Sequence, residues 1–198
     1  MVAAMVTTGT RERLVTTAQR LFASQGVGPT SPRQVLEASG VGQGSLYHHF
    51  PTKHDLAVAA VGATVEQALT AARRDLEGDG SGDPGGGVEA LDRVVAYVTR
   101  PREALAGCKV GRLTSDQAVM DDDGLRDVVT AYFVRLLAAV TATLREAGLP
   151  ADAARDRAHA AVAVVQGGYV LARATGDEDA MRAAVRGFVA LLAPEARR

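Results

Sequence analysis

The sequence has little cysteine and few aromatic side chains: its 198 residues include one Cys, no Trp, four Phe and four Tyr. The lone Cys108 excludes an internal disulfide and the zinc and iron–sulfur sites that need several thiolates. Uninterrupted apolar runs of 18 residues are also missing, and the first ten residues lack the basic segment and hydrophobic run of a secretory signal. These absences predict a cytoplasmic protein without a membrane segment.

Charge is distributed unevenly along the chain, although the net charge is only -1. Residues 1–56 contain five basic and three acidic side chains, whereas acidic side chains are in excess in the remainder. Three of the four histidines also lie in the basic part. The near-neutral total argues against a protein that coats DNA generally, and the local positive excess indicates one small region that meets an anion.

Apolar residues recur at helical spacing along most of the chain. Alanine is abundant and alternating runs of Val, Ile and Thr are missing, which favours helix over strand. Between residues 11 and 25 the apolar side chains fall on one face, and Gly26 follows as a helix-ending residue. The pattern predicts an all-α protein of about nine helices, the longer ones near residues 11–25, 52–76, 88–100, 102–119, 124–147, 151–174 and 178–193.

Two short helices are predicted between residues 31 and 50. A serine cap followed by a proline begins the first at residues 31–32, and Gly40 ends it. The second re-enters at Gly42 and ends before Pro51. A helix, a tight turn and a second helix form the geometry that places the second helix in the major groove of DNA.

The outward residues of the second short helix are short or planar groups, suited to hydrogen bonds with base edges and phosphate oxygens. Gly44 allows close approach of the backbone, and Lys53 lies beside the first turn of the next helix, where free N–H groups favour a phosphate. The predicted DNA-binding residues are Thr30, Ser31, Arg33, Gln43, Gly44, Ser45, Tyr47, His48, His49 and Lys53.

Other motifs have competing interpretations. Residues 40–44 contain three glycines, but their spacing differs from that of a dinucleotide-binding loop, and no strand precedes them. Ser45 and the nearby histidines lack the second carboxylate or thiolate of a hydrolase or metal site. Residues 121–124 lack the alternating ligands of a calcium loop, and Cys108 is either a buried thiol or a redox sensor. We predict neither a metal nor a cofactor.

The segment from Gly40 to Lys53 reads GVGQGSLYHHFPTK. It resembles the DNA-binding signature of the TetR (tetracycline-repressor) family of bacterial transcription regulators, and the resemblance covers roughly residues 10–57. The positions that carry it are Ala38, Gly40, Val41, Gly44, Leu46, Tyr47, Phe50, Lys53 and Leu56. The rest of the chain is similar only to the family's plan of six further helices, and residues 107–111 resemble a subgroup that regulates multidrug-resistance genes.

Gly42 and Gln43 depart from the family pattern, which often has Ser or Thr followed by a basic residue there. Glycine still caps a helix acceptably. Glutamine in place of a cation moves the expected base preference from guanine toward adenine, because Gln pairs with adenine through two hydrogen bonds.

The expected organisation is a disordered arm at residues 1–10, a helix-turn-helix DNA-binding domain at 11–57, and an effector-binding and dimerisation domain at 58–198. Within the last domain, residues 78–87 are rich in Gly, Asp and Ser and predict a flexible loop.

A single DNA-binding domain contacts too few base pairs for tight specific binding, so a homodimer is expected. The last two helices provide stripes for a four-helix interface, unless these stripes face the chain's own core. Interface candidates are Ala158, Ala161, Val165, Val185, Phe188 and Leu192. Candidates for the effector pocket, any of which could equally serve ordinary packing, are Tyr97, Cys108, Leu113, Gln117, Tyr132, Leu136, Gln166 and Tyr169.

The predicted function is a ligand-responsive repressor that binds a palindromic DNA operator and is released by a small hydrophobic effector. The resemblance implies that the effector tilts the helix at residues 53–76 and changes the distance between the two DNA-binding domains of the dimer. Two alternatives are a structural DNA-binding protein without an effector and an enzyme built on a helical bundle. The enzyme is disfavoured because no acid–base pair or nucleophile constellation is apparent.

Overall fold

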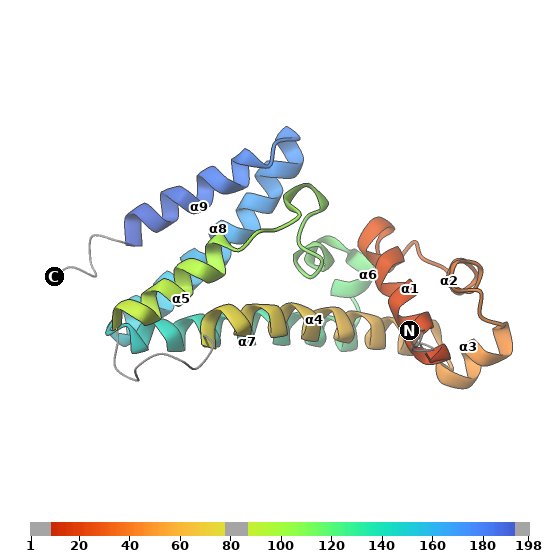
Figure 1. Cartoon of the computed structure of the whole chain (residues 1–198). Helices are drawn as coiled ribbons and strands as arrows, with labels where there is room; N and C mark the ends of the chain where they lie inside the picture. The colour runs from red at the N-terminus through yellow and green to blue at the C-terminus, as the bar shows by residue number, and fades with distance from the viewer. Residues whose placement is uncertain (1–8, 78–86, 193–198) are drawn as a thin grey trace, which may run out of the picture. The chain divides into compact units, whose positions relative to one another are not determined.

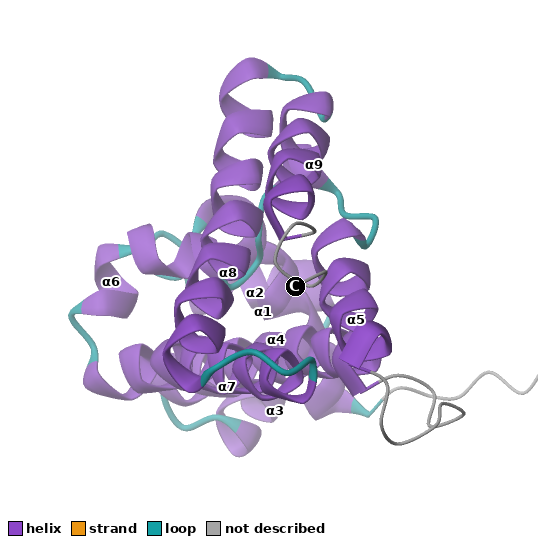
Figure 2. Cartoon of the chain, turned by 90° about the vertical axis from the view of Figure 1, so that its left-hand side faces the viewer, coloured by secondary structure: helices purple, strands orange, loops and turns teal. Residues whose placement is uncertain are grey.

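The computed structural model describes residues 9–77 and 87–192, and the statements below concern these residues. All regular elements in this part of the chain are helices joined by loops, without a strand (Figures 1 and 2). They are α1 (Thr10–Gln25), α2 (Pro32–Ser39), α3 (Gln43–His49), α4 (Lys53–Glu77), α5 (Gly87–Thr99), the 3₁₀ helices η1 (Ala104–Ala106) and η2 (Gly111–Ser115), α6 (Gln117–Met120), α7 (Asp123–Glu146), α8 (Ala151–Thr175) and α9 (Asp179–Leu192). The predicted all-α fold is confirmed.

The predicted helix at residues 102–119 is wrong. This stretch forms η1, η2 and the short α6 instead, separated by turns. Gly107 has a φ of 83°, outside the helical region, and Asp116 caps the N-terminus of α6. A glycine turn and a capping aspartate therefore divide a segment whose apolar spacing alone predicts one helix.

Two predicted flexible segments lie almost wholly outside the described residues. The predicted arm at residues 1–10 is described only at Gly9 and Thr10, where α1 begins. The predicted loop at 78–87 is described only at Gly87, the first residue of α5.

The chain divides into two compact units, and the division does not follow the sequence order. Unit 1 contains the described residues up to 66 together with residues 112–130, and unit 2 contains the others. The three boundaries fall within α4, within η2 after its first residue, and within α7. Compactness thus groups η2, α6 and the first turns of α7 with the helix-turn-helix, whereas the predicted domains at 11–57 and 58–198 divide the chain at one point.

In unit 1, α1 packs against both α2 and α3 (Figure 1). The inward face of α1 presents Leu14, Ala18 and Phe22, all of which are buried. Leu46 of α3 and the following Phe50 are buried as well. These apolar contacts fix the orientation of the short helices, which are too short to be stable alone.

In unit 2, α8 lies beside α9, and α5 packs against both (Figure 1). Gly168 of α8 makes this close approach possible, because a Cβ at this position would lie 2.9 Å from Cγ of Met181 in α9. The buried face of α9 consists of Met181, Val185, Phe188 and Leu192.

Helix α7 is long and apolar enough to cross a membrane by length and composition. Its buried residues nevertheless fall on one stripe, which includes Leu125, Leu136 and Leu144. Asp127 and Arg145 are exposed on other faces. This pattern is typical of an amphipathic helix packed on one side against a protein core.

Candidate DNA-binding surface

The helix-turn-helix predicted between residues 31 and 50 is present, and local hydrogen bonds define its ends. Ser31 and Gln34 form a reciprocal cap on α2: the Ser31 backbone N–H donates to Gln34 Oε1 at 2.7 Å, and Ser31 Oγ accepts from the Gln34 N–H at 3.3 Å. Gly40 ends α2 in the left-handed conformation, with a φ of 65°. The sequence signals therefore specify both the position and the length of α2.

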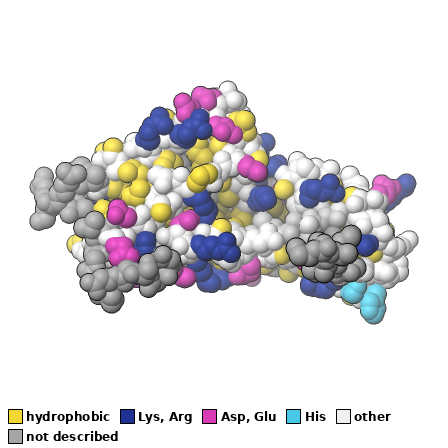
Figure 3. All heavy atoms as spheres, viewed as in Figure 1, with side chains coloured by type: hydrophobic (Ala, Val, Ile, Leu, Met, Phe, Trp, Pro, Cys, Tyr) yellow, Lys and Arg dark blue, Asp and Glu magenta, His cyan; other side chains and the backbone are white. Residues whose placement is uncertain are grey.

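Burial of Leu46 and Phe50 orients α3. Both side chains are at most 3% exposed, so the residues between them on the helix face outward. The predicted residues Gln43, Gly44, Ser45, Tyr47 and His48 are exposed and His49 is half-buried. The structure thus brings six of the ten predicted DNA-binding residues together on one short helix, where histidine side chains lie at the surface (Figure 3).

Gly44 lies on this exposed helix with open space around it. Apart from its chain neighbours and the backbone of α3 itself, no heavy atom of the described residues lies within 4 Å of the point where a Cβ would be. The backbone of α3 is therefore bare at Gly44, and a ligand can approach it closely there.

Lys53 begins α4 and connects it to the turn between α1 and α2. Its Nζ donates a hydrogen bond to the carbonyl oxygen of Gly28 at 2.9 Å. The preceding Thr52 caps α4: its Oγ1 accepts from the Asp55 N–H at 3.1 Å, and its own N–H and hydroxyl donate to the Asp55 carboxylate. These hydrogen bonds from Thr52 lower the pKa of Asp55.

Thr30 is a correction to the predicted surface. Its side chain is buried, with an exposed fraction of 1%, and its hydroxyl donates to the Gly26 carbonyl at 2.6 Å and accepts from Gln25 Nε2 at 3.1 Å. The hydroxyl is fully used in holding the turn before α2, so the Thr30 side chain does not face DNA. Arg33 is exposed and pairs with Glu37 at 2.8 Å, one turn further along α2.

Asp116 is a residue that the sequence prediction missed. One carboxylate oxygen accepts from the backbone N–H of Val27 at 2.6 Å, and the other accepts from the N–H of Ala118 at 3.1 Å. A single side chain therefore caps α6 and satisfies the amide of Val27, which is 89 residues away in sequence. No local sequence signal could reveal the second role.

Further contacts join residues 112–125 to the DNA-binding domain. The Arg112 guanidinium donates to the carbonyl of Ala23 near the end of α1. At the start of α4, His54 Nε2 lies 3.6 Å from a carboxylate oxygen of Asp122, whose same oxygen accepts from the Leu125 N–H and so caps α7. Residues 112–125 therefore hold the α1–α2 turn and the first turn of α4 within unit 1.

Five of the predicted effector residues gather in unit 2. Gln166 Nε2 lies 3.5 Å from Sγ of Cys108. Burial raises the pKa of Tyr97 to about 12, and burial also raises the pKa of Tyr132 and of Tyr169. The charge of a Cys108 thiolate would raise the pKa of all three tyrosines further, so the thiol and the tyrosines interact electrostatically.

The other three predicted effector residues are distributed differently. Leu136 of α7 is fully buried in unit 2. Leu113 and Gln117 belong to unit 1, where Leu113 is buried and Gln117 is exposed and donates to the Asp121 carboxylate at 2.6 Å. The predicted set is thus divided between the two units.

The predicted dimer-interface residues need correction. Each of the six has an exposed fraction of at most 8% within the single chain, so they form its core rather than a surface; they are Ala158, Ala161, Val165, Val185, Phe188 and Leu192. Helices α8 and α9 are therefore packed on the stripe that was expected to face a partner.

A second stripe of small apolar residues lies on another face of each of these helices, and it is exposed or half-buried. On α8 it consists of Ala160, Ala163, Val164, Gly167, Val170, Leu171 and Ala174, and on α9 of Ala180, Ala183, Ala184, Gly187, Ala190 and Leu191. Apart from the chain neighbours and the backbone of the helix itself, no heavy atom of the described residues lies within 4 Å of a Cβ built at Gly167 or Gly187. We call these residues the outer stripes.

Comparison with known proteins gives this arrangement a context. Residues 14–60 match the profile of the bacterial regulatory proteins of the tetR family, and residues 84–187 match that of the C-terminal domain of LmrA/YxaF-like transcriptional regulators. The chain belongs to the TetR family. TetR-family proteins are transcriptional regulators that bind DNA and typically act as dimers. The chain is accordingly a DNA-binding regulator and not an enzyme.

The similar TetR-family proteins span nearly the whole chain. The uncharacterized HTH-type regulator YxaF of Bacillus subtilis is 31% identical over 172 residues, which cover 85% of this chain and 87% of YxaF. The regulator LmrA of the same organism is 28% identical over 162 residues, covering 81% and 85%. A TetR regulator from Legionella pneumophila has the same fold, with a TM-score of 0.76 at 22% identity over 93% of this chain and 97% of that one.

Replacing Asp116 with Ala should loosen the α1–α2 turn. The variant lacks the cap of α6 and leaves the buried N–H of Val27 without its acceptor, so the free energy of unfolding should fall by about 1–2 kcal/mol. Hydrogen exchange at Val27 should become faster. Asp121→Ala, which removes an exposed carboxylate, is the control and should change stability by less than about 0.5 kcal/mol. Unchanged exchange at Val27 in the Asp116 variant would contradict this role.

Proposed function

We propose that this TetR-family regulator is a cytoplasmic repressor that binds a palindromic operator as a homodimer and is released by a small hydrophobic effector. The observation that carries the DNA-binding part is the orientation of α3. Its apolar residues Leu46 and Phe50 are buried beneath it, while its polar residues are exposed on a helix seven residues long. A helix held in this way is able to enter the major groove.

The exposed groups divide into two roles. Gln43, at the N-terminus of α3, reads a base edge, because N-terminal residues of a recognition helix approach the bases. Ser45, Tyr47, His48, His49 and Lys53 contact phosphates or neighbouring edges, and the bare backbone at Gly44 allows the close approach. Ser31 and Arg33 contribute at the start of α2.

The homodimer is proposed to form through the outer stripes of α8 and α9. Residues at these positions recur at intervals of three and four, so each stripe is one helix face. Leu191 is 75% exposed and Val170 is 67% exposed, a cost that burial against a second subunit would remove. Gly167 and Gly187 leave room for a helix of the partner to approach closely, and two helices from each subunit would form a four-helix interface.

The effector is proposed to bind near the cluster of Tyr97, Cys108, Tyr132, Gln166 and Tyr169. These residues combine aromatic surface with a thiol and an amide, which is the composition of many small-molecule sites. Because α4 has residues in both units, a structural change around this cluster can be transmitted through α4 to the DNA-binding domain. Multidrug-resistance genes as targets are supported by the resemblance of residues 107–111.

Lys53→Gln should weaken binding to every DNA sequence. If Lys53 neutralises a phosphate, the slope of log Kd against log salt concentration should decrease by about 0.9 for each lysine replaced, and a dimer has two such lysines. Lys109→Gln removes an exposed lysine of unit 2 and should leave the slope unchanged. A slope that is the same for both variants and the original protein would remove Lys53 from the DNA footprint.

Gln43→Ala should relax base preference without a general loss of affinity. Selection from random DNA should return adenine at one position of each half-site for the original protein and no strong preference there for the variant, a difference of about 1–3 kcal/mol. Binding to scrambled DNA serves as the internal control. Guanine at that position for the original protein, or equal losses on selected and scrambled DNA, would refute the assignment.

Leu171→Glu together with Leu191→Glu should dissociate the dimer. Burying unpaired carboxylates in an apolar interface costs about 2 kcal/mol or more, so sedimentation should show a dimer Kd raised about thirtyfold or more. Val134→Glu changes an α7 residue that is 60% exposed and lies outside the stripes, and it should leave the dimer intact. The interface is located elsewhere if the double variant remains as dimeric as this control.

A further inference from the structure

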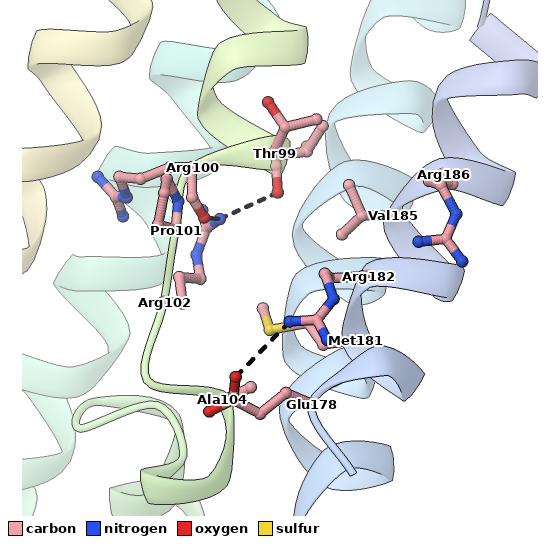
Figure 4. A pocket seen from close by; sticks show the side chains of 11 residues that line it. Thr99, Arg100, Pro101, Arg102, Ala104, Glu178, Met181, Arg182, Val185 and Arg186 are labelled. Carbon is pink, nitrogen blue, oxygen red and sulfur yellow. Dashed lines mark hydrogen bonds and ion pairs between the residues drawn. The ribbon is translucent and has the colours of Figure 1, made fainter.

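A cavity of about 550 Å³ lies in unit 2 between the end of α5 and the first turns of α9 (Figure 4). Its apolar surface includes Val98, Met181 and Val185, all of which are buried. Its volume lies within the range of sites that hold small organic ligands, about 300–1,000 Å³. None of its lining residues belongs to the effector cluster proposed above.

Four arginines and a single carboxylate line this cavity. Arg100 and Arg102 come from the segment that follows α5, and Arg182 and Arg186 come from α9, where they are one turn apart (Figure 4). Among the described residues of the lining, Glu178 is the only acidic one. The cavity therefore combines an apolar floor with an excess of positive charge.

The four arginines differ in how they are neutralised. Arg100 pairs with Asp75 at 2.9 Å, and Arg182 pairs with Asp179 at 2.6 Å and with Glu178 at 3.6 Å. Arg102 donates only to the backbone carbonyls of Tyr97, Val98 and Arg100, and burial lowers its pKa. These carbonyls belong to the last turn of α5 and the residue that follows it, which explains the position of Arg102.

Arg186, like Arg102, has no ion pair within the described part of the chain, but it differs from Arg102 in being exposed and free of hydrogen bonds to backbone carbonyls. An exposed guanidinium beside an apolar cavity is a suitable partner for a carboxylate, which it binds through two parallel hydrogen bonds. Asp179 interacts with Arg186 electrostatically without forming an ion pair, so the exposed guanidinium that a ligand carboxylate can reach lies on the α9 side of the cavity.

The cavity and most of the outer stripe use different sides of α9. At 100° per residue, Arg182 and Arg186 lie on one flank of the buried face, and Ala180, Ala184, Gly187 and Leu191 lie on the opposite flank. Ala183 and Ala190 of the outer stripe lie between the two flanks, next to Arg186. A partner subunit seated on the outer stripe therefore leaves the flank of Arg182 uncovered and comes close to Arg186.

We propose that this cavity binds an amphipathic organic anion, with its carboxylate at Arg186 and Arg182 and its apolar part against Val98, Met181 and Val185. The neighbouring Glu178 competes for Arg182 and repels the carboxylate of the ligand. The proposal concerns ligand binding by the folded chain, and it does not depend on the DNA contacts or the effector cluster proposed above.

Calorimetric titration of the full-length protein with three probes of equal chain length tests the site: octanoate, octanol and octyltrimethylammonium. Octanoate should bind once per chain, at least tenfold more tightly than the other two. Arg186→Gln should weaken octanoate binding about tenfold or more, the effect of losing hydrogen bonds between charged groups. Arg173→Gln, which changes an exposed arginine of α8 outside the cavity, should have no effect.

Glu178→Gln provides a test with the opposite sign. Removing this carboxylate leaves Arg182 paired with Asp179 alone and eliminates repulsion of the ligand, so octanoate should bind more tightly to this variant than to the original protein, a gain that general damage to the fold would not produce. The proposal is overturned if octanoate binds no better than octanol, if Arg186→Gln leaves its affinity unchanged, or if Arg173→Gln weakens it equally.

Discussion

The burial of Leu46 and Phe50 is the interaction on which the DNA-binding surface depends. Helix α3 has only seven residues and no side-chain cap at its first residue, so its own hydrogen bonds cannot hold it in place. The apolar contacts with α1 supply that restraint and at the same time determine which residues face outward. Recognition chemistry on α3 is therefore a consequence of packing beneath it, and a change at Leu46 would alter every outward residue together.

Residues far along the sequence also restrain the DNA-binding domain. Asp116 and Arg112 bond to backbone groups at the end of α1 and in the turn that follows it, and His54 faces Asp122 at the start of α4. These contacts explain why residues 112–130 belong to the same compact unit as the helix-turn-helix. Two segments, which the family profiles assign to different domains at residues 14–60 and 84–187, thus together determine the packing of the helix-turn-helix.

Local signals were sufficient to predict the helix-turn-helix, because the serine cap, Gly40 and Pro51 act within a few residues of themselves. The same signals were misleading where a distant or subtle contact decides the outcome. The Thr30 hydroxyl is a group that can bind a phosphate, but it donates its hydrogen bond to the Gly26 carbonyl in the turn before α2. Helices α8 and α9 carry small apolar residues on two faces each, so periodicity could not tell which face is buried. The pairing of Asp116 with Val27 spans 89 residues and leaves no local trace.

Neighbouring residues of the α1–α2 turn are held by side chains of opposite charge: the Val27 N–H by Asp116 and the Gly28 carbonyl by Lys53. A lysine that moves from Gly28 to a DNA phosphate exchanges an internal hydrogen bond for an external one, so the gain in affinity is smaller than the phosphate contact alone would provide. The carbonyl of Gly28 then becomes available to water. The DNA-bound and DNA-free proteins would consequently differ in the solvation of the Gly28 peptide group, next to the Val27 amide that Asp116 continues to hold.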